Sequence, residues 1–394
     1  MKIAILTSGI LPVPAVQGGA VENLIDFYLE YNEHNRLHDI TIFSVYHHNV
    51  EKHPALKSSV NHYKYINTSS LLYKVQRKLF ALHNKGIYNY FIEFFFEKAY
   101  KLLSKSHYDL IILENRPGFA IKLSKRLTTP IVAHIHFDML SDPLSTYIFD
   151  DIKGFICVSD FLYKKSSETI KRKCITVHNG IDLTQFTLPS NITYTKNRQA
   201  YNISKSDILL VYSGRITPIK GVKELIEAMI LINNKNIKLL IIGSSSFGTA
   251  NDKDEYCQSV YESAQKIKDQ IIFTGCQPYS KIPALLSICD IAVVPSLCND
   301  AFPTTVLEAQ AIGLPIITTN YGGIPEQVTT ENAIILTPKE TFTQDLASAI
   351  SLLAKDEALR IKMRKASLER TKLFSKEVYA ESFFKAISLF RNID

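Results

Sequence analysis

Two patterns of hydrophobic and polar residues alternate along the chain. Short runs rich in Ile, Val and Leu are separated by longer segments in which apolar residues recur every three or four positions. The short runs are typical of buried parallel strands, and the longer segments are typical of amphipathic helices. The repeated order of strand and helix predicts βα units, in which helices cover both faces of a parallel sheet.

The predicted strands fall into two series, each of which indicates a doubly wound sheet. The first series has strands at 2–6, 40–45, 110–113, 131–134, 154–158 and 174–177, with helices at 21–31 and from about 71 to 104. The second series has strands at 208–212, 237–242, 271–273, 291–294, 315–318 and 333–336. We therefore expect an α/β protein with two facing sheets and a cleft lined by the carboxyl ends of their strands.

The boundary between the two series lies in a polar stretch. Residues 183–206 are rich in Thr, Asn, Ser and Gln and show no strong periodicity, which is typical of a junction. Apolar residues at helical spacing then follow residue 338. We expect domains at 1–190 and 191–374 and a final helix at 375–394, in keeping with two domains for 394 residues.

Composition narrows the class of protein. Apolar residues make up 46% of the chain and charged residues 21%, which excludes a wholly disordered or collagen-like chain. The six cysteines are scattered, without a Cys-x-x-Cys pair, so we expect reduced thiols and a cytoplasmic protein. No apolar stretch is long enough to span a membrane.

The net charge of +7 is concentrated in one segment. Residues 57–126 contain thirteen Lys and Arg against four Asp and Glu. Aromatic residues are interleaved with these charges, at Tyr63, Tyr65, Tyr73, Phe80, Tyr88, Tyr90, Phe91, Phe94, Phe95, Phe96 and Tyr100. Either this segment contacts the anionic inner face of the cell membrane to reach a lipid-linked acceptor, or the aromatics are core and the lysines are solvated. No recognition motif for nucleic acid accompanies it.

Three loops at predicted strand ends carry candidate chemistry. In the first, Gly18 and Gly19 precede a helix, so the loop either binds an anion with its backbone N–H groups or simply needs positive φ angles. In the second, Arg215 and Lys220 follow a buried strand. A guanidinium fork and an ammonium group together suit a diphosphate.

The third loop joins a strand to a helix near residue 304 and contains Asp300, with Glu308 eight residues further on. A carboxylate accepts hydrogen bonds from sugar hydroxyls, and a helix N-terminus donates N–H groups to phosphate. Asp300 can equally be an N-terminal helix cap.

Two histidines share one face of a predicted strand end. His134 and His136 alternate in the segment 132–138, so strand periodicity places them on the same side. A zinc pair is conceivable, but the sequence indicates no third ligand, and a structural role is the alternative.

Together these motifs resemble the GT-B glycosyltransferases, specifically the large retaining family four, or glycosyl transferases group one, which uses nucleotide sugars. The resemblance covers nearly the whole chain and is strongest from Ile208 to Glu326. Its motifs are Gly18-Gly19, Asn179-Gly180-Ile181-Asp182, Ser213-Gly214-Arg215 with Lys220-Gly221, the Asp300 and Glu308 motif, and Gly322-Gly323-Ile324-Pro325-Glu326. It implies two Rossmann-like domains, with the C-terminal helix crossing back to the first.

The resemblance also implies roles for single residues. Arg215 and Lys220 would bind the donor diphosphate, Glu308 the ribose, and His136 would lie near the donor sugar, with Asp300 at the family's sugar-binding carboxylate. The remaining donor-binding residues implied are Gly18, Gly19, Gly214, Gly275, Pro278, Phe302, Thr304 and Thr305. No metal or other cofactor is expected.

Two positions depart from the family pattern. Asp300 stands where the family has Glu, one methylene longer, so the identity of the donor sugar stays open. Pro303 stands where a small Gly is frequent, and it removes one N–H donor.

The resemblance implies transfer with retention of anomeric configuration, from a UDP-sugar in the first place or a GDP-sugar, to a glycan or lipid-linked acceptor in surface polysaccharide or glycolipid synthesis. A sugar-nucleotide epimerase of the same architecture and a non-catalytic sugar-binding protein are the alternatives.

Overall fold

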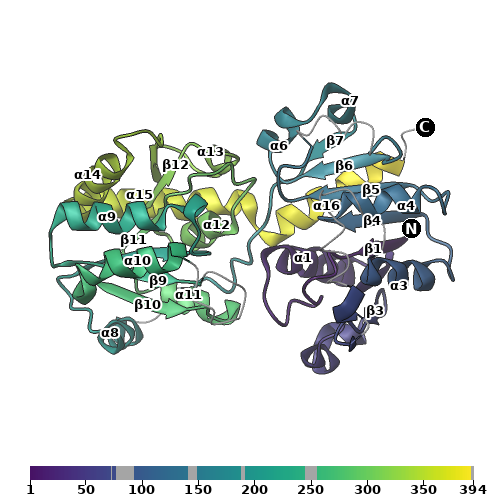
Figure 1. Ribbon diagram of the computed structural model, residues 1–394, viewed down its shortest axis with the longest axis horizontal. Coiled ribbons are helices and arrows are strands. Elements are labelled where there is room, and N and C mark those ends of the chain that lie inside the picture. The colour runs from purple at the N-terminus through teal and green to yellow at the C-terminus, as the bar shows by residue number, and fades with distance from the viewer. Residues whose placement is uncertain (72, 77–92, 141–148, 188–190, 245–254, 392–394) are drawn as a thin grey trace. The chain divides into compact units, whose positions relative to one another are not determined.

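The chain forms two compact units (Figure 1). The structure is a computed structural model, and it describes residues 1–71, 73–76, 93–140, 149–187, 191–244 and 255–391. The first unit consists of Met1–Gly180 and Lys376–Asp394, and the second of Ile181–Ser375. The chain leaves the first unit at Gly180, ten residues before the expected position, and returns to it for its last helix.

The first unit contains a seven-stranded parallel sheet with the order β3-β2-β1-β4-β5-β6-β7. Its strands are β1 Lys2–Leu6, β2 Asp39–Val45, β3 Asn61–Ile66, β4 Leu110–Glu114, β5 Ile131–Ile135, β6 Gly154–Cys157 and β7 Cys174–Thr176. The sequence pattern predicts all of these except β3. This edge strand pairs only with β2 and is largely polar, so it lacks the apolar run that marks the buried strands.

Helices of the first unit differ in part from expectation. They are α1 Ala20–Asn35, α3 Phe94–Leu103, α4 Ala120–Leu123, α6 Asp160–Lys165, α7 Glu168–Lys171 and α16 Lys376–Arg391. The prediction of one helix from 71 to 104 is wrong at Glu93, which has extended backbone angles and caps α3 with its side chain. Residues 77–92 of that predicted helix lie outside the described residues.

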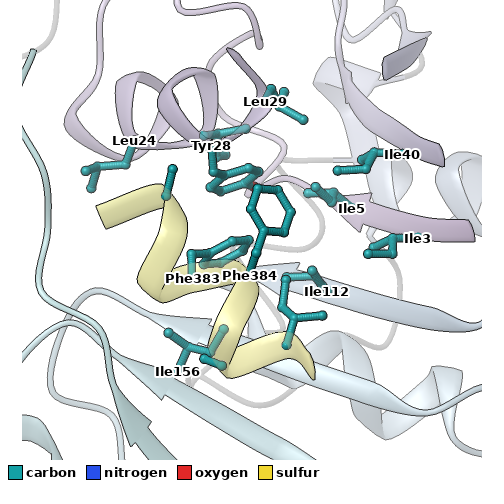
Figure 2. Packing of buried hydrophobic residues seen from close by; sticks show 14 of the residues in the cluster. Ile3, Ile5, Leu24, Tyr28, Leu29, Ile40, Ile112, Ile156, Phe383 and Phe384 are labelled. Atoms are coloured by element: carbon teal, nitrogen blue, oxygen red, sulfur yellow. The ribbon is translucent and has the colours of Figure 1, made fainter. Parts of the chain in front are cut away.

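The core of the first unit depends on the returning helix α16, which packs against α1 and the sheet (Figure 1). Tyr28 of α1 and Phe383 of α16 stack with ring centroids 4.2 Å apart and an interplanar angle of 5°. Figure 2 shows these rings with Phe384 beside the apolar side chains of β1 and β4. Such aromatic pairs contribute about 0.5–1.5 kcal/mol beyond the burial of their surface.

The aromatic residues of the basic segment divide between core and surface. Phe95 and Phe96 of α3 are completely buried, and Lys122 and Arg126 both pair with Glu97 of the same helix. For Phe95 and Phe96 the structure therefore favours the core interpretation. Phe80, Tyr88, Tyr90 and Phe91 lie outside the described residues.

The second unit contains a six-stranded parallel sheet with the order β10-β9-β8-β11-β12-β13. Its strands are β8 Ile208–Ser213, β9 Ile237–Ile242, β10 Ile271–Gly275, β11 Ile291–Val294, β12 Ile316–Thr319 and β13 Ala333–Leu336. Its helices are α8 Asn191–Ala200, α9 Val222–Ile232, α10 Glu255–Gln265, α11 Ile282–Leu286, α12 Thr304–Ala311, α13 Ile324–Gln327, α14 Phe342–Lys355 and α15 Glu357–Thr371. The second strand series is thus confirmed.

Helix α8 lies in the stretch that was expected to be an irregular junction. Its Arg198 is buried and donates hydrogen bonds to the carbonyls of Ser204, Asp207 and Ile288 and to the carboxylate of Asp290. A single cation thus holds this polar segment to the sheet. Because Ile288 and Asp290 are about ninety residues away in sequence, a local pattern does not predict this helix.

For the residues it describes, the structure agrees with the expectations of reduced cysteines and of no membrane-spanning apolar segment. All six cysteines are free, and Cys157, Cys257 and Cys289 are buried. Within the described residues, no helix combines the length and apolarity that crossing a bilayer requires.

Candidate functional site

Two loops meet at the carboxyl edge of the second sheet, after the neighbouring strands β8 and β11. Gly221, at the start of α9, has a left-handed φ of 70°, and a Cβ there would lie 2.0 Å from the carbonyl oxygen of Pro295. The N–H of Leu297 donates to the carbonyl of Ile219 at 2.9 Å. Only glycine permits this close approach, which brings the loop of Lys220 against the loop of Asp300.

A third loop, after β12, joins the same group. Gly322 has a φ of 63°, and a Cβ there would lie 2.0 Å from the carbonyl oxygen of Asp300. That carbonyl also accepts a hydrogen bond of 2.7 Å from the N–H of Gly323. Gly322 is thus needed for packing against the Asp300 loop, and Gly323 contributes its backbone N–H.

Lys220 and Asp300 form a direct ion pair. The Nζ of Lys220 lies 2.5 Å from Oδ1 of Asp300, and the other carboxylate oxygen accepts a hydrogen bond of 2.6 Å from the hydroxyl of Ser296. Both charged side chains are about four-fifths buried. Without a ligand, Lys220 is therefore neutralised by Asp300, and a bound phosphate must share or replace that contact.

The alternative interpretation of Asp300 as a helix cap is wrong. Helix α12 begins at Thr304, its N-cap residue is Pro303, and no side chain caps it. Asp300 instead directs its carboxylate to Lys220 and Ser296. The carboxylate therefore binds residues of the neighbouring loops and not the N-terminus of α12.

Arg215 is the second cation of the cluster and differs from Lys220. It is exposed and, among the described residues, forms no ion pair. Its carbonyl accepts a hydrogen bond of 2.6 Å from the hydroxyl of Tyr212, which fixes the backbone of the loop directly after β8. Gly214, which precedes Arg215, has a φ of 152°. Its carbonyl oxygen lies so close to Gly243, at the end of β9, that a Cβ on Gly243 would collide with it. The guanidinium is therefore available to an anion.

The first turn of α12 is held rigidly beside this cluster. Phe302 is buried and packs edge-on against Phe374 with centroids 5.5 Å apart. The carbonyl of Pro303 accepts a hydrogen bond of 2.9 Å from the side chain of Gln327. The first N–H groups of a helix lack partners within it, so Thr304 and Thr305 present donors to an anion.

Glu308, one turn further along α12, is a buried carboxyl group. Burial raises its pKa to about 7, against a smaller opposing effect of the hydrogen bond from Thr304. Tyr279 is close enough that the charges of Glu308 and Asp182 add to the effect of burial in raising its pKa. Within the described ranges no cation pairs with Glu308, so this side chain is suited to accept hydrogen bonds from neutral hydroxyl groups.

Gly275 and Pro278 lie at the carboxyl end of β10, at the same edge of the sheet. Gly275 has a φ of 67°, its carbonyl accepts a hydrogen bond from the N–H of Gly243, and no atom lies within 4 Å of the position of a Cβ. Pro278 precedes the short helix that contains Tyr279. This loop therefore approaches Glu308 through Tyr279.

Gly18 and Gly19 belong to the first unit. Their φ angles are 75° and 110°, so both need the conformational freedom of glycine. A Cβ on Gly19 would lie 2.2 Å from a carboxylate oxygen of Glu22, whereas the space around Gly18 is open. Burial raises the pKa of Glu22 to about 7, so the loop wraps a carboxyl group in the first turn of α1.

His136 also belongs to the first unit, where it meets His134 and a residue that the sequence analysis missed. Glu114 ends β4 directly opposite His134 of β5. Its completely buried carboxylate lies 3.1 Å from Nδ1 of His134 and 3.3 Å from Nε2 of His136, and accepts a hydrogen bond of 2.9 Å from the hydroxyl of Tyr28. The sequence lacks any local signal for Glu114, because its partners come from α1 and from the end of β5, which are distant from it in the chain.

The pKa values of Glu114 and His136 are both lowered, for different reasons. Burial raises the pKa of Glu114, but the neighbouring His134 and His136 outweigh it and bring the value down to about 2. Burial, with a contribution from His134, lowers the pKa of His136 to about 4. At neutral pH the group therefore holds an ionised carboxylate and a neutral His136.

The second unit matches a known family. Residues 193–370, nearly all of this unit, match the glycosyl transferases group 1. The second unit is therefore a domain of this family. The family match and a relative named as a glycosyltransferase both support a transferase.

Two curated relatives add to this family match. YtcC of Bacillus subtilis, which is named as a glycosyltransferase, is 29% identical over 381 residues, covering 93% of this chain and 86% of that protein. The N,N'-diacetylbacillosaminyl-diphospho-undecaprenol alpha-1,3-N-acetylgalactosaminyltransferase of Campylobacter jejuni is 30% identical over 220 residues, covering 54% and 53%. The first of these similarities spans both units.

Solved structures show the fold. HepE of Anabaena, crystallised with UDP and glucose, superposes with a TM-score of 0.76 at 18% identity, covering 98% of this chain and 99% of that one. This similarity and the two parallel sheets establish the GT-B fold, and the return of α16 to the first unit agrees with it.

Replacing Glu308 with Gln is expected to stabilise the enzyme at neutral and alkaline pH. Because the native pKa of Glu308, about 7, lies above the ordinary value of 4.5, the native state loses stability as pH rises from about 4.5 to about 7. The substitution removes this loss, a gain of about 1–3 kcal/mol above pH 7. Denaturant unfolding of E308Q and of the wild type between pH 5 and 8 measures the difference. The exposed Glu262→Gln is the control, and parallel curves for E308Q and wild type would contradict the expectation.

Proposed function

We propose that this group 1 glycosyl transferase moves a sugar from a nucleoside diphosphate sugar to a glycan or lipid-linked acceptor, with retention of anomeric configuration. The observation that carries the donor assignment is the loop cluster of the second unit. It combines Arg215, Lys220 and the first turn of α12 at one edge of the sheet, where doubly wound folds bind ligands. Two cations and helix N–H groups together match a diphosphate.

Each part of the cluster has a separate task in this proposal. Lys220 and Arg215 bind the diphosphate and stabilise the charge that develops on it as it leaves, without needing a metal ion. Glu308 accepts hydrogen bonds from the ribose hydroxyls. Asp300, held by Lys220 and Ser296, accepts from a hydroxyl of the donor sugar. The loop of Gly275 and Pro278 contacts the base.

We favour a UDP-sugar over a GDP-sugar as donor, because HepE was crystallised with UDP and with UDP-glucose. The polyprenyl diphosphate in the name of the Campylobacter relative supports a lipid-linked acceptor. We accordingly place the enzyme in polysaccharide or glycolipid synthesis at the cytoplasmic face of the membrane.

The proposed mechanism needs no protein nucleophile. The acceptor hydroxyl attacks from the face that the nucleotide leaves and gives its proton to an oxygen of the leaving phosphate. The C–O bond to the phosphate breaks and the new glycosidic bond forms on the same face, so the configuration is kept.

The configuration of the product tests this mechanism. We expect an enzyme incubated with an α-linked UDP-sugar and a hydroxyl acceptor to give an α-linked product, read from the anomeric coupling in the proton NMR spectrum. A β-linked product would exclude retention. Release of UDP with no glycan product would favour the epimerase interpretation instead.

Lys220→Ala is expected to slow transfer by roughly a hundred- to a thousandfold, the scale of losing one preorganised group that stabilises developing charge. Initial rates of UDP release at saturating acceptor measure the effect. Lys235→Ala is the control, because Lys235 is exposed and precedes β9, at the opposite end of the strands. Equal activity of K220A and K235A would show that the diphosphate binds elsewhere.

For the first unit we propose peripheral contact with an anionic membrane. The support is that Leu71 and Val75, four residues apart, are 78% and 51% exposed, and that the exposed Lys74 lies between them. Apolar side chains beside a cation suit the interface of an anionic bilayer.

Flotation with phosphatidylglycerol vesicles at low and high salt tests this contact. We expect the wild type to float at low salt and L71E/V75E to stay at the bottom of the gradient. Leu231→Glu and Leu352→Glu, at exposed leucines of the second unit, are the controls. If the wild type floats at neither salt concentration, the alternative interpretation holds, in which the aromatic residues of the basic segment are core and its lysines are solvated.

A further inference from the structure

Glu114 has no task in the proposed mechanism, yet three donors surround its completely buried carboxylate. Its two oxygens face Tyr28 Oη, His134 Nδ1 and His136 Nε2 at 2.9, 3.1 and 3.3 Å. An ionised carboxylate only accepts hydrogen bonds. Each of these three atoms must therefore carry a proton that points at Glu114.

This requirement fixes the tautomer of His136. A neutral imidazole has one N–H and one nitrogen with a free lone pair. With its proton on Nε2 facing Glu114, the lone pair of His136 is on Nδ1. Among the described residues this Nδ1 has no hydrogen-bond partner, and the side chain retains 7% exposure at the carboxyl end of β5. The ring thus offers an acceptor where ligands of such sheets bind.

The backbone of His136 is fixed as well. Its N–H donates to Oδ1 of Asn115 at 3.3 Å, and the N–H of Asn115 donates to the carbonyl of His134 at 2.9 Å. Asn115 has a left-handed φ of 57°, which turns the chain directly after Glu114. The end of β4 therefore holds both the backbone and the ring of His136.

The far side of the group is closed by aromatic rings. The ring of His134 lies 5.3 Å from that of Phe383, and its Nε2 is buried without a hydrogen-bond partner. Tyr28, the third donor to Glu114, stacks on Phe383 (Figure 2). Helices α1 and α16 thereby keep water from Glu114 and leave His136 as the ring that can meet a ligand.

We propose that Glu114 is a positioning residue for sugar transfer: it holds His136 with Nε2 protonated, so that Nδ1 accepts a hydrogen bond from a sugar hydroxyl. This inference rests on the proposed function. A rival occupant of the same group is a zinc ion, because Glu114, His134 and His136 have their ligand atoms within 4.8 Å of one another. We favour the hydrogen-bonded arrangement, since Tyr28 and both rings already satisfy the carboxylate.

Nitrogen NMR of the full-length protein labelled with ¹⁵N-histidine reads the tautomer without any substrate. We expect the wild-type His136 to show protonated Nε2 and unprotonated Nδ1, with its signals assigned by their loss in H136A. In Glu114→Gln we expect this preference to disappear, because an amide does not demand a donor at that point. A protonated Nδ1 in the wild type, or stoichiometric zinc found by elemental analysis of the purified protein, would overturn the proposal.

A double-mutant cycle connects the tautomer to the reaction. We expect E114Q to lower kcat/KM by about ten- to a hundredfold, the scale of a lost charge-assisted hydrogen bond, but by less than about twofold when His136 is already Ala. Equal losses in the two backgrounds would mean that Glu114 merely supports the fold. Glu93→Gln is the matched control, since Glu93 is a half-buried carboxylate of the same unit that caps α3. We expect Glu93→Gln to change the melting temperature of the protein without changing the tautomer of His136.

The kinetic constants also identify the sugar that meets His136. A rise in the KM for the UDP-sugar, with an unchanged dissociation constant for UDP, assigns the hydroxyl to the donor sugar. A rise in the KM for the acceptor alone assigns it to the acceptor. If no nucleotide sugar is turned over, the proposed function fails, while the NMR result still decides whether Glu114 sets the tautomer.

Discussion

Close backbone packing at two glycines is the constraint on which the candidate donor site depends. At Gly221 and Gly322 any side chain would collide with the carbonyl of a neighbouring loop, and both residues have left-handed φ angles. A non-glycine residue there would cost about 1–3 kcal/mol in backbone strain, before any collision is counted. Because the three loops can meet, Lys220 lies at Asp300, although eighty residues separate them in the chain.

The charges of the second unit are arranged at a cost to stability. Glu308 is buried on α12 without a cation among the described residues, and burial alone raises its pKa. Lys220 is held by Asp300, whereas Arg215 is exposed beside it. A group that is desolvated in advance binds a ligand without further rearrangement, which is the usual reason for keeping such a group in a site.

The buried carboxylate of the first unit, Glu114, is satisfied in a different way from Glu308. The buried group of this unit is built around one carboxylate that three donors satisfy, so it is stable without a ligand. The last helix of the chain contributes to it through Phe383, which packs on both Tyr28 and His134. The return of α16 to the first unit is therefore part of the support of His136 as well as part of the core.

The sequence by itself determined the parallel strands and the residues of the loops, because buried strands are read from local apolar runs and glycines and charges at their ends are visible directly. The elements it missed have no such runs: β3 is a polar edge strand, and α8 is held by long-range hydrogen bonds of Arg198. Likewise, the place of Asp300 before a helix left a capping role open beside sugar binding, and only the structure shows that its carboxylate pairs with Lys220. Only the tertiary structure decided which side chains meet, since the order of strands in a sheet is set by packing of distant segments. Glu114 became part of the site for that reason, because β4 and β5 are neighbours in the sheet and α1 covers them.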